Sequence, residues 1–298
     1  MRILDTQQFI NEKLSIQPVT KDRLSKFREE VPSVDEKARR FIEKSNLVWN
    51  PKTMSYDCEG SVNVSEDIVA DGKLKIKFGK VSGYFDCSRN NLTTLEGVPK
   101  EVGGHFDCSR NNLTTLEGAP KDVGGNFYCG DNNLTTLDGA PQEVGGKFNC
   151  RYNNLTTLEG APQEVCGDFS CSNNQLTTLK GTPKKVGGYF GCSNNQLTTL
   201  EGAPQKVGGD FYCYNNKLTT IEGAPKEVDG DFSCGYNVLT SLEGAPQEVS
   251  GNFYCSNNIL TSLEGAPQKV GGDFDCSNNP DLVLPEEKPS WVKGKIIS

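Results

Sequence analysis

Apolar positions along this chain recur with a fixed period of 21 residues. A Phe occupies the same place in ten successive segments, from Phe85 to Phe274, and a Cys follows it two residues later each time, from Cys87 to Cys276. Two Leu or Ile positions, a Pro and a Val keep their own places between these marks. A period without drift is typical of a solenoid in which every repeat forms one coil.

Within one repeat, three stretches predict different backbone structures. The alternation in Phe253-Tyr254-Cys255 predicts a short strand whose Phe and Cys face the core. The Asn column from Asn90 to Asn279 predicts a turn whose amides bond to the backbone of their own and the next coil. The Gly-Ala-Pro stretch is unsuited to a helix, so we expect it to be extended or polyproline-like.

The phrase FxCxxNxLTxL resembles the leucine-rich-repeat pattern, with Phe and Cys in places usually held by Leu or Val. The following EGAPxxV is similar to the short class of bacterial leucine-rich effector proteins, although each repeat here has one residue more and the ubiquitin-ligase domain of some effectors is not recognised. This resemblance covers residues 56–290. It implies a right-handed coil with one parallel β-sheet on its concave face and an extended, polyproline-like convex side.

A weaker resemblance concerns origin. The stretches KFGKVSGYFDCS and FINEKL are similar to segments of uncharacterised repeat proteins encoded by tailed bacteriophages. This similarity implies a phage origin and says little about activity.

The ends of the chain depart from the repeat. Thr6 and Thr20 can each begin a short helical segment, and the capping-box pair Ser33 and Glu36 can begin a third. We interpret these segments as a small α-helical lid over the first coil, with a partner-binding or address helix as the alternative. Val64 is expected to stand for Phe in a worn first repeat. The predicted organisation is a helical N-terminal cap (1–48), a degenerate capping repeat (49–83), a ten-strand array (84–279) and a C-terminal cap (280–298).

Charge and cysteine usage restrict the partners and the compartment. The formal net charge is −8, and the first 55 residues hold 11 Lys and Arg against 8 Asp and Glu, so the remainder carries −11. This acidic balance argues against nucleic acid as a partner. No stretch reaches membrane-spanning length and no signal-peptide core is recognised. Because ten of the twelve Cys form one repeat column, we expect free thiols in a reducing cytoplasm, that of the host cell if the chain is phage-encoded.

Candidate chemistry is sparse. The Cys column lacks the paired spacing of a metal site, His105 is the only His and has no recognisable catalytic partners, and no phosphate-binding loop is present. We therefore expect no enzyme, no cofactor and no metal centre. One alternative stays open, because Asp210 and Asp231 should be neighbours in one column and like charges there favour an intervening Ca²⁺ or, preferably, a basic group of a partner.

Positions on the solvent side of the predicted strands vary from repeat to repeat, whereas core positions hardly change. Eight of the nine Tyr lie on or beside these strands, and Tyr is well suited to anchor an interface. Drift of solvent-facing positions is the alternative explanation. We expect Tyr212, Tyr214, Tyr236 and Tyr254 at the centre of a recognition face. The predicted partner-binding residues are Tyr128, Lys147, Arg151, Tyr152, Asp168, Tyr189, Asp210, Tyr212, Tyr214, Asp231, Tyr236, Tyr254, Asp273 and Asp275.

These observations favour a non-enzymatic module that binds a protein partner through its sheet face, with a host factor as the target if the chain is phage-encoded. The alternative is a structural component of a virion or surface, in which the repeats act as a rigid spacer or attachment element.

Overall fold

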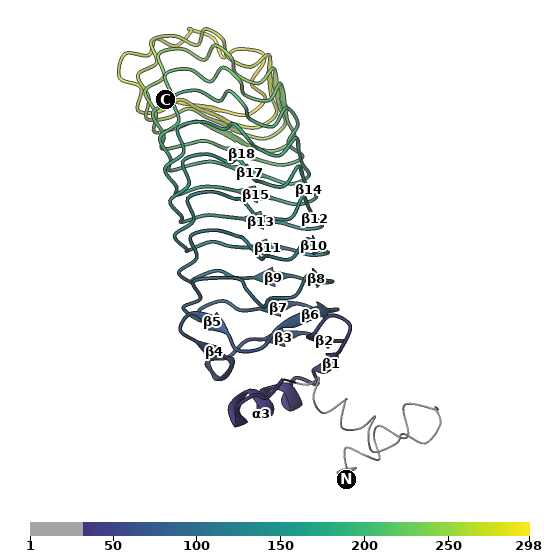
Figure 1. Ribbon diagram of the computed structural model, residues 1–298. Helices are drawn as coiled ribbons and strands as arrows, with labels where there is room; N and C mark the ends of the chain where they lie inside the picture. The colour runs from purple at the N-terminus through teal and green to yellow at the C-terminus, as the bar shows by residue number, and fades with distance from the viewer. Residues whose placement is uncertain (1–31) are drawn as a thin grey trace, which may run out of the picture.

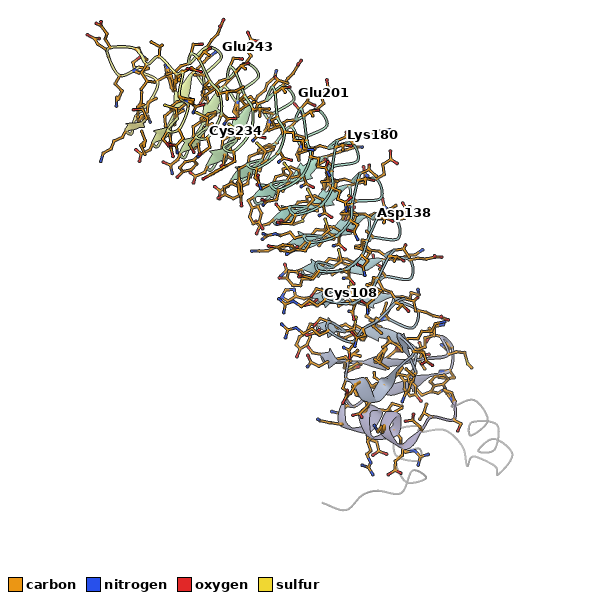
Figure 2. All side chains as sticks on the ribbon, turned by 90° about the vertical axis from the view of Figure 1, so that its left-hand side faces the viewer. Cys108, Asp138, Lys180, Glu201, Cys234 and Glu243 are labelled. Carbon is orange, nitrogen blue, oxygen red and sulfur yellow. The ribbon has the colours of Figure 1, made fainter. Side chains whose placement is uncertain are left out.

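The computed structural model describes residues 32–298, which form a stack of coils with one helix at its N-terminal end (Figure 1). Each repeat makes one coil, because Phe106 pairs with Phe127 and Phe127 with Phe148 in parallel strands. The stack is bent into an arc, with the labelled Cys108 and Cys234 toward its concave side and Glu201 and Glu243 on its convex side (Figure 2). The predicted parallel-strand solenoid is confirmed.

The first strand of each coil joins a twelve-stranded parallel sheet, the Phe ladder. Ten of its strands begin at the repeated Phe, and one strand extends the sheet at each end. In order they are β3 (Val62–Asn63), β7 (Phe85–Asp86), β9 (Phe106–Asp107), β11 (Phe127–Tyr128), β13 (Phe148–Asn149), β15 (Phe169–Ser170), β17 (Phe190–Gly191), β18 (Phe211–Tyr212), β20 (Phe232–Ser233), β22 (Phe253–Tyr254), β24 (Phe274–Asp275) and β25 (Ile296–Ile297).

The core is a set of columns that run through the stack. All ten repeated Phe side chains are fully buried, and neighbouring rings such as Phe127 and Phe148 have centroids 5.2 Å apart in a stacked arrangement. Burial of one Phe side chain stabilises a fold by about 2–3 kcal/mol. The buried Leu and Val columns line the rest of each coil. Because each coil covers its neighbours, the core is continuous along the stack.

The predicted Asn column is a hydrogen-bond ladder between coils. Asn132 Nδ2 donates to the carbonyl of Cys108 in the preceding coil at 3.0 Å and to that of Cys129 in its own coil at 3.2 Å. Its Oδ1 accepts from the backbone N–H of Leu113 at 3.1 Å. Asn153 repeats this pattern one coil later. The amide thus gives the buried Leu113 N–H its partner and shares the carbonyls of Cys108 and Cys129 with the neighbouring Asn residues of the ladder.

The structure has a second ladder of strands besides the single predicted sheet, and this ladder is parallel except for its first strand, which is antiparallel to the second. Its strands are mostly a charged residue followed by the repeated buried Val, so it is called the Val ladder. Bridges from Val186 to Val207 and from Val207 to Val228 connect its two parts. The strands are β1 (Val48–Asn50), β2 (Ser55–Cys58), β6 (Phe78–Val81), β8 (Glu101–Val102), β10 (Asp122–Val123), β12 (Glu143–Val144), β14 (Glu164–Val165), β16 (Lys185–Val186), β19 (Glu227–Val228), β21 (Glu248–Val249) and β23 (Lys269–Val270).

The convex side contains a tight turn in each coil. In a representative coil the N–H of Ala140 donates to the carbonyl of Leu137 at 3.0 Å, and Gly139 has φ of 94°. A Cβ on Gly139 would lie 2.5 Å from the carbonyl carbon of Leu116 in the preceding coil. Glycine is therefore needed both for the left-handed backbone and for the close approach of the coils.

The described part of the N-terminal cap is a single helix, α3 (Glu36–Lys44), which buries Ala38 and Phe41. The prediction of Ser33 as its cap is wrong: Asp35 is the N-cap, and its carboxylate accepts from the Ala38 N–H at 2.8 Å. This bond, followed by the Lys75 ammonium, lowers the pKa of Asp35. The segments predicted after Thr6 and Thr20 lie outside the described residues. Among residues 32–298, no helix has the length and apolar character needed to cross a bilayer.

The worn first coil is two residues longer than the repeat. Val62, and not the predicted Val64, pairs with Phe85, so the spacing here is 23 residues, whereas Val81 pairs with Val102 as predicted. Val62 is fully buried. The extra length is taken up in the segment that holds the 3₁₀ turn η1 (Glu66–Ile68) and the antiparallel pair β4 (Val69–Ala70) and β5 (Lys73–Leu74).

The C-terminal segment forms one more incomplete coil. Ile296 pairs with Phe274, and Val292 forms a parallel bridge with Val270. Trp291 covers the end of the aromatic stack, with its ring centroid 5.1 Å from that of Phe274 in an edge-on arrangement. The last Phe of the array is thereby shielded from solvent.

Candidate partner-binding face

The solvent side of the Phe ladder carries four columns of side chains. The entry column is the residue before each repeated Phe, from Tyr84 to Asp273, and the middle column is the residue after it. The exit column is the residue after each Cys, and the turn column is the next one, from Arg89 to Asn278. All the predicted partner-binding residues belong to these columns.

Acidic residues of the entry column are engaged by the fold. Asp168 Oδ1 accepts from the backbone N–H of Tyr189 at 3.0 Å. Asp210 Oδ1 accepts from the N–H of Asp231 at 2.8 Å, and Asp231 Oδ1 from that of Asn252 at 2.7 Å. Each carboxylate therefore links its coil to the next. Asp210 and Asp231 lie in adjacent coils, as expected, and a backbone N–H already engages one oxygen of each carboxylate.

Other entry-column residues with an acceptor atom also bond to the backbone of the next coil. His105 Nδ1 and Asn126 Oδ1 accept from the next coil's N–H, each at 2.8 Å, and Asp273 does the same for the N–H of Lys295. Lys147 has no acceptor, and its ammonium instead reaches Asp168 Oδ2 at 2.8 Å, which raises the pKa of Lys147. The single His of the chain thus makes a structural hydrogen bond to the next coil.

Three of the predicted tyrosines form a cluster. The ring of Tyr212 lies between those of Tyr189 and Tyr214, with centroids 6.1 and 6.5 Å away. Its hydroxyl donates to Asp210 Oδ2 at 2.6 Å. Burial, together with this carboxylate, raises the pKa of Tyr212. Tyr214 is 38% exposed, so the cluster presents aromatic surface to solvent beside the Tyr212 ring, which Asp210 holds in place.

The remaining middle-column residues of the predicted set are half-buried and partly engaged. The Tyr128 hydroxyl accepts from Asn126 Nδ2 at 2.6 Å. Asp275 Oδ1 accepts from the backbone N–H of Ser277 at 3.0 Å. Burial, followed by the Asp231 carboxylate, raises the pKa of Tyr254. These contacts fix the positions of the side chains and leave one edge of each toward solvent.

The turn column has a left-handed backbone in every coil. Asn occupies five of its ten positions, as expected where φ is positive. Tyr152 and Tyr236 have φ of 55° and 54° and are 52% and 61% exposed. These two predicted residues lie at the rim of the face and are separate from the Tyr212 cluster.

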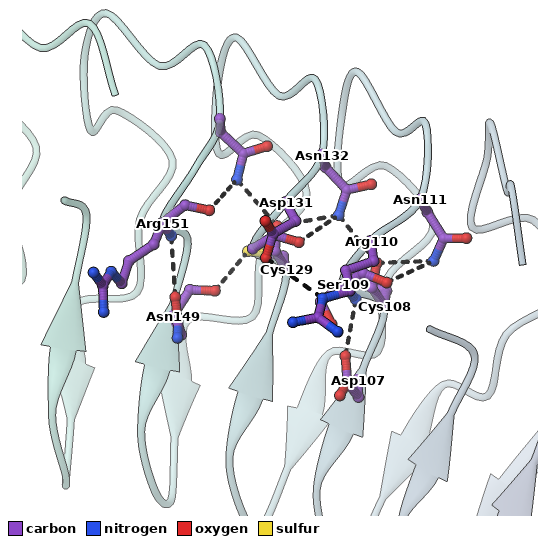
Figure 3. Close-up of polar contacts among 12 residues, drawn as sticks. Asp107, Cys108, Ser109, Arg110, Asn111, Cys129, Asp131, Asn132, Asn149 and Arg151 are labelled. Carbon is purple, nitrogen blue, oxygen red and sulfur yellow. Dashed lines mark hydrogen bonds and ion pairs between the residues drawn. The ribbon is translucent and has the colours of Figure 1, made fainter. Parts of the chain in front are cut away.

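A concavity of about 600 Å³ opens on the N-terminal half of the face. Gly130, whose missing side chain leaves space, lies among its lining residues, which include Arg89, Arg110 and Arg151. Figure 3 shows Arg110 and Arg151 next to Asn111 and Asn132 of the Asn ladder. Sequence reasoning identified Arg151 and missed Arg89 and Arg110, because from the turn column it chose only the tyrosines, Tyr152 and Tyr236. The loss of the consensus Asn at both places is the signal that could have found them.

The cysteine column is part of the core. All twelve cysteines are free, and Cys166 is the exposed one. The thiols of Cys150 and Cys171 donate to carbonyls of the next coil at 3.3 and 3.4 Å, and burial raises the pKa of both. Within residues 32–298 no group of three or more His, Cys, Asp or Glu side chains is placed to hold a metal ion. The arrangement offers hydrogen bonds and aromatic surface for recognition.

Comparison with known proteins adds little to this picture. No family model and no curated protein matches the chain. Among solved structures it is similar to YopM from Yersinia enterocolitica WA-314, with a TM-score of 0.48 and 15% identity, covering 92% of this chain and 71% of that chain. A likeness at this level carries no argument about function, so the description of the fold rests on the coils themselves.

Proposed function

We propose that the chain is a non-enzymatic protein-binding module that holds its partner on the concave side, against the solvent face of the Phe ladder. The observation that carries this proposal is the Tyr189, Tyr212 and Tyr214 cluster. It stands on a scaffold whose core positions hardly change from coil to coil, and its central hydroxyl is held by Asp210. An aromatic group that is fixed before binding loses little conformational entropy in a complex.

Charge supports a protein partner over nucleic acid. The chain has a formal net charge of −8, and phosphate backbones need a basic footprint. The proposal includes a host factor as the partner if the chain is phage-encoded and acts in the host cytoplasm. A rigid spacer in a virion is the second candidate, and it requires no specific contact with the face.

The experiment is capture of a partner by the purified full chain, with identification by mass spectrometry. The variant Tyr212→Ala/Tyr214→Ala/Tyr254→Ala should lose the captured protein, because it removes the aromatic surface without touching the core columns. The matched control is Glu201→Ala/Glu243→Ala on the convex side (Figure 2), which should retain it. Equal capture by both variants, at unchanged melting temperature, would contradict the proposal and leave the spacer interpretation.

A further inference from the structure

The arginines of the coiled part of the chain are gathered in one place. Residues 49–298 contain three Arg, and all three line the concavity around Gly130. Lys, by contrast, occurs throughout the array. Arg presents a planar fork of donors that matches a carboxylate or phosphate, whereas Lys is a point charge. The use of Arg at these positions therefore indicates recognition of an oxyanion. A role in solubility alone would be served equally well by Lys.

The positions of two of these arginines are conformationally costly. Arg89 and Arg110 have φ of 57° and 55° in the turn column, where five other coils have Asn. Bulky side chains disfavour this left-handed region, and such outliers are concentrated at binding sites. Arg151 and Gly130 likewise replace the Ser that most coils have in the exit column. Four departures from the consensus of these two columns thus lie in the lining of the concavity.

The guanidinium groups are only weakly engaged within the chain. Arg110 Nε lies 3.9 Å from Asp131 Oδ2, at the outer limit of an ion pair, and both side chains are about half exposed. Arg151 is held with its guanidinium carbon 5.3 Å from the centre of the Tyr152 ring. Arg89 is exposed and forms no ion pair with any residue from 32 to 298. Donors on three neighbouring side chains are therefore available to one ligand.

We infer that this concavity binds an acidic peptide segment of the protein partner, with carboxylates paired to Arg89, Arg110 and Arg151. The inference rests on the proposed function and assigns part of the partner's chemistry. Asp86, Asp107 and Asp131 also line the concavity, so the closely and rigidly spaced phosphates of a nucleic acid would meet repulsion there. A flexible peptide can place its carboxylates at the guanidinium groups and keep them away from these three Asp side chains.

The test uses the full chain and a fluorescein-labelled hexaglutamate peptide, with hexaglutamine as the uncharged control and fluorescence anisotropy at low salt as the readout. The variant Arg89→Asn/Arg110→Asn/Arg151→Gln should weaken hexaglutamate binding at least about tenfold, since several charge-assisted hydrogen bonds are lost. The control Lys180→Gln/Lys184→Gln/Lys185→Gln removes the same charge from exposed positions elsewhere and should change affinity less than about twofold. Asn is the turn-column consensus, so the Arg variant should melt no lower than the wild type.

Three results would overturn the inference: no binding of hexaglutamate by the wild type, an equal loss in the Lys variant, or an oligothymidylate that binds the same arginines more tightly than hexaglutamate. The Tyr212→Ala/Tyr214→Ala/Tyr254→Ala variant separates this inference from the proposed function. It should keep hexaglutamate binding while losing the partner. Failure of the peptide experiment with retained dependence of capture on the tyrosines would remove only the arginine site.

Discussion

At the scale of single residues, the turn column contains residues that suit its positive φ in some coils and bulky exposed residues that do not suit it in others. Asn tolerates a positive φ because its short amide can bond locally, and half of the coils use it there. Tyr236 adopts φ of 54° with most of its side chain exposed. The ring contributes little packing to its own coil. We interpret it as a residue retained for contact with a partner at some loss of stability.

Tyr236→Asn should therefore raise the free energy of unfolding by about 0.5–1 kcal/mol, because the backbone strain is relieved and little burial is lost. Urea unfolding followed by circular dichroism measures the change. The reverse substitution Asn257→Tyr, at φ of 57° in the next coil, is the matched control and should lower stability by a similar amount. A Tyr236→Asn protein less stable than the wild type would show that the ring supports the fold.

At the scale of the coil, stability comes from side chains that satisfy the backbone of a neighbouring coil. The Asn ladder does this on the core side, and the acidic entry column does it on the solvent side. Burial of the thiols adds a third column, with Cys150 and Cys171 donating to the following coil. Each coil is thus tied to the next at fixed points along its length.

Asn132→Ala should cost about 2 kcal/mol, because the buried Leu113 N–H loses its partner, whereas the carbonyls of Cys108 and Cys129 each keep a second amide donor. Asn133→Ala is the control, since that side chain is exposed, and it should stay within about 0.5 kcal/mol of the wild type. The midpoints of denaturant unfolding compare the stabilities of the two variants. A difference below 1 kcal/mol between them would mean that water replaces the ladder bonds.

The period and the core columns could be predicted from the sequence, because a repeat that must stack on itself fixes which residues face inward. The role of Asp210 and Asp231 could not be predicted from the sequence. The alternation of residues shows that the two side chains face solvent, but it does not show that their oxygens accept from the N–H groups of the next coil. The Val ladder was missed because a charged residue before a lone Val gives no strand pattern. Val62 was missed because a two-residue insertion breaks the count.

At the scale of the whole molecule, the concave side presents two distinct groups of side chains. The arginine concavity lies in the N-terminal half and the Tyr212 cluster further along. Arg110 and Tyr212 belong to coils that are five repeats apart. At about 4.8 Å per strand this is roughly 24 Å, within the reach of one ordinary interface. A single partner could therefore contact both groups, with its acidic segment toward the N-terminal end.

Hydroxyl-radical footprinting of the full chain, with and without its captured partner, tests the central claim most directly, because it probes exposed Tyr rings, which react fast, without mutation. The account predicts that the partner protects Tyr214 and Tyr236 on the face of the Phe ladder, while Lys180, Glu201 and Glu243 on the convex side react as they do in the free chain. Protection of the convex residues with undiminished reactivity of Tyr214 and Tyr236 would contradict it.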